Sequence, residues 1–113
     1  MMFQGCESLT KAPALPAETL ADDCYLYMFY DCTSLTQAPA LPATTLADSC
    51  YSSMFQNCSS LNNVNVNFSE WSNATFNWLK NVSSTGIFTC PATLPDTPRD
   101  ASHIPAGWTR NNK

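Results

Sequence analysis

The chain has little charge, very little glycine and a single histidine. Charged residues make up 12% of its 113 residues, and it contains three glycines and one histidine, His103. Three scattered glycines leave no glycine-rich loop to hold a phosphate, and one histidine far from the cysteines gives no zinc-type spacing. No apolar run has the length that a membrane span needs. We therefore expect no cofactor, no bound metal and no membrane insertion by this chain.

Positive charge is also scarce, which bears on the partners of the protein. Five basic residues stand against nine acidic ones, giving a net charge of −4, and residues 1–60 contain one base, Lys11. No basic patch exists that could release counterions from a phosphate backbone, so nucleic-acid binding is not expected. The start also lacks the basic and apolar regions of a secretory signal.

A 26-residue repeat dominates what the sequence does contain. Residues 2–27 and 28–53 align without gaps and share 18 of 26 positions, and a third copy begins at residue 54 and diverges after Leu61. A unit this short cannot bury its own apolar face, so repetition at this period predicts stacked coils, that is, a solenoid. The chain opens in the middle of a unit, which predicts an upstream part carrying any signal or anchor.

Each unit divides into two halves. The first, at 33–41, predicts a short strand, because Pro39 removes a backbone donor and limits its length. The second, at 45–55, predicts a short helix, because Thr45 can cap its start and Asp48 follows three residues later. Its apolar residues recur every four positions on one stripe: Leu46, Cys50 and Met54.

The third coil diverges from the repeat in its second half. Residues 61–68 alternate apolar and polar side chains, which predicts a half-buried strand. Residues 69–82 carry the strongest helical pattern of the chain and contain two tryptophans, so we expect a helix that covers the open end of the core. Residues 87–90 predict a further strand.

The sequence thus predicts one α/β domain spanning residues 1–113. Its expected architecture is a right-handed solenoid of 26-residue coils, each with a short strand, a proline turn and a short helix. The coils are expected at 2–27, 28–53 and 54–68, followed by a C-terminal cap of helix and strand at 69–113.

The repeat also predicts an interior ladder of cysteines and phenylalanines. Side chains at equivalent positions of a stacked repeat lie next to one another, and cysteine is among the most buried residue types. Two states of the thiols remain open: buried thiols, or the disulfides Cys6–Cys24, Cys32–Cys50 and Cys58–Cys90. The expected core ladder consists of Cys6, Cys32, Cys58, Cys24, Cys50, Phe3, Phe29 and Phe55.

Candidate binding residues lie where the copies differ. Tyr27 and Tyr30 are replaced in the next copy by Ser53 and Gln56. Variable side chains on a fixed frame are typical of a binding surface, and tyrosine suits contacts with proteins and sugars. Tyr27, Tyr30 and Gln56 are therefore the candidate binding residues, with ordinary exposed tyrosines as the alternative interpretation.

Acidic residues also recur in phase. Asp22 and Asp48 lie on neighbouring coils with Asp23 beside them, which could hold Ca²⁺ or simply cap the predicted helices. The capping interpretation explains both residues at once. No pair of carboxylates, and no set of nucleophile, base and orienting group, stands out, so we expect no enzyme activity and no catalytic residue.

The repeat resembles the BspA-like leucine-rich repeats of bacterial surface proteins, found especially in Bacteroidetes. An aromatic-x-x-Cys-x-x-Leu stretch followed by Leu-Pro carries the resemblance, at Phe29, Cys32, Leu35 and 41–42. The terminus is also similar, with Asn-Trp-Leu at 77–79 and Ile-Pro-x-Gly-Trp-Thr at 104–109. The family has isoleucine where this chain has Cys24 and Cys50, which implies an interior position for these thiols.

The resemblance implies a noncatalytic module that is secreted or attached to the cell surface. Such a module would mediate adhesion by binding a host or bacterial surface protein or a glycan. The alternative is a structural spacer or stalk, or a segment of a phage tail fibre, with no ligand of its own.

Overall fold

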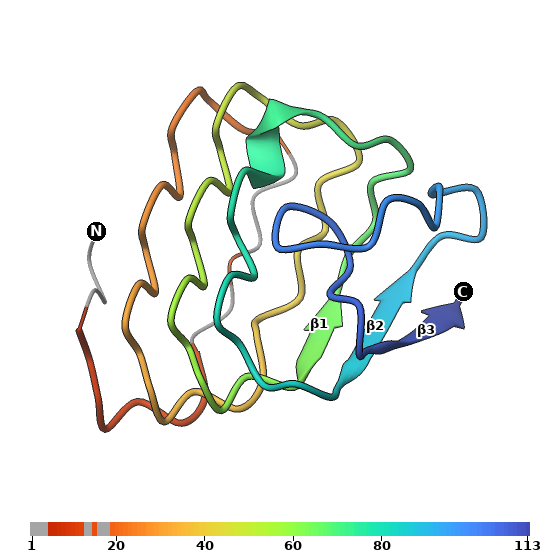
Figure 1. Cartoon of the computed structure of the whole chain (residues 1–113). Coiled ribbons are helices and arrows are strands. Elements are labelled where there is room, and N and C mark those ends of the chain that lie inside the picture. The colour runs from red at the N-terminus through yellow and green to blue at the C-terminus, as the bar shows by residue number, and fades with distance from the viewer. Residues whose placement is uncertain (1–4, 13–14, 16–18) are drawn as a thin grey trace.

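The computed structural model of the chain describes residues 5–12, 15 and 19–113 (Figure 1). Its named elements are three short strands and one 3₁₀ turn. They are β1 (Asn63–Asn65), η1 (Asn73–Thr75), β2 (Ile87–Cys90) and β3 (Thr109–Asn112). The expected strand at 87–90 is confirmed, and the expected strand at 61–68 is present in its middle as β1.

The three strands form a parallel sheet in the order β1-β2-β3. Isolated parallel bridges, Lys11 with Gln37 and Leu41 with Val66, continue this pairing toward the N-terminal side. The alternating pattern of 61–68 is explained by burial, since Val64 and Val66 are fully buried between exposed or half-buried asparagines.

Glycine is required at the start of β2. A Cβ atom on Gly86 would lie 2.6 Å from the Trp108 ring and 2.7 Å from the Asn62 carbonyl oxygen. The lack of a side chain at Gly86 therefore lets the last aromatic residue of the chain close over the sheet.

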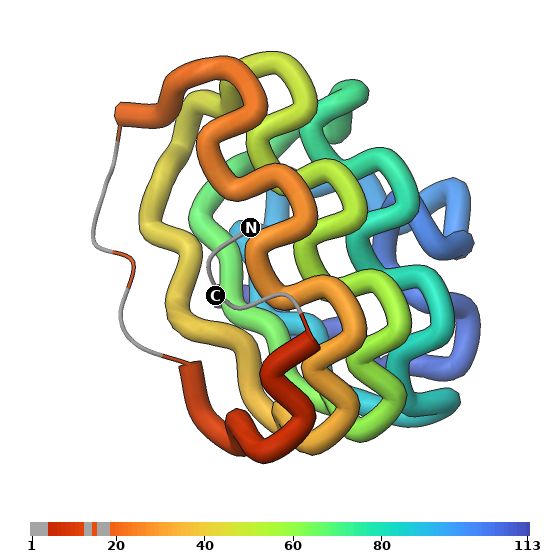
Figure 2. The backbone as a smooth tube through the Cα atoms, turned by 90° about the vertical axis from the view of Figure 1, so that its left-hand side faces the viewer, coloured from red at the N-terminus to blue at the C-terminus, as the bar shows by residue number. Residues whose placement is uncertain are grey.

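A repeated series of turns runs opposite the sheet, and we call it the turn ribbon; it comprises residues 21–32, 47–58 and 71–82. Within it, alternate N–H groups bond three residues back, as Met28 N–H does to the Tyr25 carbonyl (3.1 Å). The intervening N–H groups bond to the following coil, as Tyr25 N–H does to the Cys50 carbonyl (3.0 Å). Figure 2 shows the three ribbon segments, in orange, yellow-green and teal, side by side with the same zigzag. Among the described residues, the backbone-to-backbone bonds between ribbon segments all point the same way, from N–H toward the C-terminal side.

Positive φ angles recur every fourth residue along the ribbon. They lie between 51° and 66°, in the left-handed region that costs an ordinary L-residue about 1–2 kcal/mol. Asparagine and aspartate tolerate this region best, and serine hydrogen-bonds its own backbone in turns. The residues concerned are Asp23, Tyr27, Asp31, Ser49, Ser53, Asn57, Asn77 and Asn81. Seven of these eight side chains are short and polar, so the sequence suits the ribbon.

The prediction of strand–helix coils with a helical C-terminal cap is wrong. Across the described residues η1 is the longest helical segment, and the stretch at 45–55 forms turns instead of a helix. At 69–82 the Ser72 side chain caps η1, and the C-cap residue Phe76 leaves the helical region with ψ at 120°. Asn77 then takes a φ of 52°. In a helix the backbone N–H groups bond within the segment, whereas alternate ribbon N–H groups bond to carbonyls of the neighbouring coil. These bonds favour the ribbon over a helix, and the chain is therefore not a solenoid of strands and helices.

Aromatic stacks fill the space between the ribbon and the sheet. The rings of Phe29 and Phe55 are 5.6 Å apart and nearly parallel, at 2°. Tyr51 stacks on Tyr25 on one side (6.1 Å) and on Trp78 on the other (6.0 Å). The core therefore consists of side chains from equivalent positions, placed one above the other by the coils.

Candidate functional site

The cysteines of the expected ladder are mostly interior. Cys32, Cys50 and Cys58 are fully buried, whereas Cys6 is half-buried and Cys24 is exposed. No disulfide joins any pair among the six, all of which belong to the described residues. Phe29 and Phe55 are fully buried, and Phe3 lies outside the described residues.

Burial keeps the interior thiols protonated. It raises the pKa of Cys50 to about 11 and that of Cys58 to about 12, from an ordinary value of 9. The Cys58 thiol also donates a hydrogen bond to the Phe29 carbonyl over 3.0 Å. Because the thiolate is the reactive form, these arrangements favour a structural role for both cysteines.

The periodic aspartates bond across coils. A carboxylate oxygen of Asp22 accepts the backbone N–H of Asp48 at 3.1 Å, so it caps the neighbouring turn rather than a helix of its own. Among the residues that the structure describes, no three His, Cys, Asp or Glu side chains gather as metal ligands would. The same residues contain no helix with the length and apolarity of a membrane span.

The three candidate binding residues lie on one surface of the turn ribbon, which we call the turn face (Tyr27, Tyr30 and Gln56). The rings of Tyr27 and Tyr30 meet edge to face with centroids 5.5 Å apart. Tyr27 is 37% exposed, and its φ is 58°. The Gln56 carbonyl accepts the N–H of Asp31, which places Gln56 next to Tyr30 on the following coil. The structure therefore brings the three residues together.

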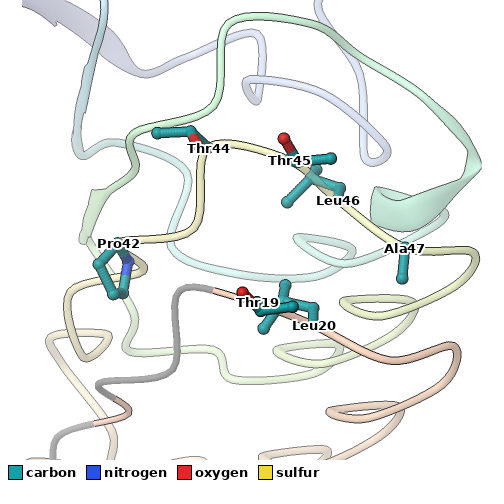
Figure 3. A pocket seen from close by; sticks show the side chains of 7 residues that line it. All are labelled: Thr19, Leu20, Pro42, Thr44, Thr45, Leu46 and Ala47. Atoms are coloured by element: carbon teal, nitrogen blue, oxygen red, sulfur yellow. The ribbon is translucent and has the colours of Figure 1, made fainter.

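Two adjoining recesses lie where the chain turns from the sheet side into the turn ribbon, and we call them the corner hollows. The larger, of about 440 Å³, is lined by 19–20, Pro42 and 44–47. Figure 3 shows Thr19 and Leu20 of one coil facing Thr45 and Leu46 of the next. The smaller, of about 170 Å³, is lined by 44–46 and 68–72. The two recesses share residues 44–46 and so form one continuous feature across the coils.

The corner hollows were not predicted as a site from the sequence. Thr45 was interpreted as a helix cap, but there is no helix for it to cap, and its side chain is exposed at both recesses. A signal was present, because the recurrence of Thr19 and Thr45 after the second proline of each unit marks a regular row of hydroxyl groups. Helix capping explained the same recurrence equally well.

His103 lies between an aspartate and a tryptophan. Its Nδ1 is 2.7 Å from a carboxylate oxygen of Asp100, and its ring meets Trp71 edge to face at 4.9 Å. The hydrogen bond from His103 lowers the pKa of Asp100. Trp71 also donates its indole N–H to the Pro95 carbonyl (2.8 Å), so the C-terminal segment fixes this tryptophan beside the smaller hollow.

The chain was compared with models of protein families, with curated proteins and with solved structures. None of the three comparisons gave a match.

Proposed function

We propose that the protein is a noncatalytic recognition module, secreted or held at a cell surface, that binds a host or bacterial surface protein or a glycan. The observation that carries the proposal is the turn face, where Tyr27, Tyr30 and Gln56 occupy variable positions on a regular frame. The resemblance to BspA-like repeats supports the same function, since those proteins are associated with adhesion.

The backbone of Tyr27 supports a binding role for the turn face. A bulky side chain at positive φ is strained, whereas the equivalent Ser53 in the next coil is small and nearly buried. Strained residues that persist are concentrated at functional sites. The edge-to-face contact with Tyr30 restricts the Tyr27 ring, so little side-chain freedom is lost when a partner binds.

The repeat provides a clean experiment on the turn face. The double substitution Tyr27→Ser/Tyr30→Gln gives each position the residue that the following copy carries there, Ser53 and Gln56, so the variant is expected to fold. We expect it to weaken binding to a matrix protein or glycan captured from a broad panel by about tenfold or more, because rigid tyrosines are frequent hot spots. Surface plasmon resonance measures the loss.

The matched control substitutes Glu7→Thr and Lys11→Gln, which likewise introduces residues of the following copy, Thr33 and Gln37, but leaves the turn face intact. Its affinity should equal that of the unmodified chain. Equal affinities for all three proteins would exclude the turn face as the site. Failure of the folded chain to bind anything on the panel would favour the alternative, a spacer or tail-fibre segment.

A further inference from the structure

The corner hollows present a row of hydroxyl groups, one from each of three coils. Thr45 follows Thr19 by 26 residues, and Ser69 follows Thr45 by 24, the same offset that separates Asn57 from Asn81, whose side chains bond across the same two coils. Thr19 and Thr45 line the larger hollow, and Thr45 and Ser69 line the smaller one, so the three hydroxyl groups follow one another across the coils. All three side chains are exposed, and none has a hydrogen-bond partner within the part of the chain that the structure describes.

Apolar groups form the floor and one wall beside these hydroxyls. Leu20 and Leu46 are half-buried in the larger hollow, and Phe68 is buried beneath the smaller one. Trp71 is half-buried at the smaller hollow, where its ring packs edge to face on Phe68 at 5.5 Å. The hydrogen bond from the Trp71 indole to Pro95 holds the ring in place. A rigid aromatic wall provides contact area at a low cost in conformational entropy.

The charge of the corner hollows selects among polar ligands. Among the residues that the structure describes, Glu70 is the one titratable side chain that lines them, and Asp48 follows directly after Ala47 at their edge. Both are acidic, so an anionic ligand is repelled. Hydroxyl groups donate and accept hydrogen bonds, and they therefore match a ligand that carries many hydroxyl groups of its own.

We propose that the corner hollows bind a short neutral oligosaccharide that runs across the coils. One sugar face packs on Trp71, and the ring hydroxyls bond to Thr19, Thr45 and Ser69. This inference deepens the proposed function by naming a ligand class, and it uses residues separate from the turn face. A neutral peptide is the alternative occupant.

Isothermal titration of the 113-residue chain with neutral hexasaccharides, namely cellohexaose, mannohexaose and chitohexaose, tests the proposal. At least one should bind saturably, and binding should change the fluorescence of Trp71. Thr45→Val keeps the shape of the side chain and removes its hydroxyl, so we expect roughly five- to tenfold weaker binding. Trp71→Leu should reduce affinity further and abolish the fluorescence change.

Two controls separate this site from the turn face and from general effects on the fold. Thr33→Val changes an exposed threonine outside the hollows and should bind as tightly as the unmodified chain. Tyr27→Ser/Tyr30→Gln should also retain oligosaccharide binding, even where it loses the panel ligand of the turn face. If only the tyrosine variant loses oligosaccharide binding, the corner site is wrong and the proposed function stands.

Three further results would overturn the inference. The first is a folded chain that binds none of the three hexasaccharides at millimolar concentration. The second is preferential binding of oligogalacturonate, an anionic probe of similar length. The third is tighter, Thr45-dependent binding of a neutral Ser/Gly peptide than of any sugar, which would assign the hollows to a peptide.

Discussion

The buried thiols couple stability to pH at the scale of single residues. Cys50 and Cys58 are fully buried in apolar surroundings, and burial raises the pKa of both well above that of an exposed thiol. In the unfolded chain the same thiols lose their protons near pH 9. The folded state therefore holds protons that the unfolded state releases in alkaline solution, and stability must fall there.

We predict that the free energy of unfolding is flat with respect to these thiols below about pH 8 and decreases between about pH 9 and 12. Each thiol contributes a slope of up to about 1.4 kcal/mol per pH unit in this window. Urea denaturation at pH 7, 9 and 10.5 measures the slope, and Cys58→Ala should reduce it. An unchanged slope in Cys58→Ala would show that this thiol does not titrate on unfolding.

At the scale of elements, the turn ribbon shows why the helices at 45–55 and 69–82 were wrongly predicted. Leu46, Cys50 and Met54 are four residues apart, which fits one face of a helix but also fits a turn that repeats every four residues. The same interval places Ser49, Ser53 and Asn57 at the positive φ angles. Side chains that tolerate left-handed backbone, repeated at a strict interval of four, were the signal that distinguishes the ribbon from a helix of 3.6 residues per turn.

Other features could be predicted from the sequence. The alternation at 61–68 identified buried Val64 and Val66, because period two is specific to a strand. Tyr27 and Tyr30 were predicted as candidate binding residues because the copies differ there, and the structure places their rings in contact. The corner hollows were not predicted, because a recess depends on the distance between the side chains of two coils. The repeat shows which residues are equivalent but not how far apart they lie.

Asn57 belongs to a ladder of side-chain hydrogen bonds that crosses the turn ribbon. Its amide donates to a carboxylate oxygen of Asp31 (2.9 Å), and its side-chain oxygen accepts from Asn81 (2.8 Å). All three residues have positive φ. Asn57→Gly loses the ladder but suits the backbone, whereas Asn57→Ala loses the ladder and is also strained.

We predict that Asn57→Ala is less stable than Asn57→Gly by about 0.5–1 kcal/mol, the reverse of their order in a helix. Chemical denaturation of the two variants gives this difference directly. A more stable alanine variant would indicate helical backbone at this position and contradict the ribbon.

At the scale of the whole molecule, Trp78 connects the coils to the C-terminal segment. It is fully buried, its ring packs against Tyr51 and Phe88, and its indole N–H donates to the His103 carbonyl at 3.1 Å. This side chain therefore joins the repeated coils, the sheet and the last loop, which contains His103 and precedes β3, in one core. Removal of this side chain should therefore destabilise all three parts together.

We predict that Trp78→Ala lowers the free energy of unfolding by about 3–5 kcal/mol, the usual cost of truncating a buried aromatic residue. Phe76→Ala is the control, since Phe76 lies two positions away and is 59% exposed, and it should change stability by less than about 0.5 kcal/mol. Urea denaturation followed by circular dichroism compares the two. Similar losses for both would mean that the core is not organised around Trp78.

The single direction of the ribbon hydrogen bonds gives the molecule an electrical polarity. Parallel strands nearly cancel their peptide dipoles, but the ribbon peptides that bond between coils align, so their partial charges add along the stack as they do in a helix. The positive end faces the last loop, where the N–H groups of Asn77 and Leu79 meet Ser102 and Ala101. Asp100 places a carboxylate next to this loop, which suits that end of the dipole. An added coil would move the two partial charges further apart, so the dipole moment of such a protein grows with its number of repeats.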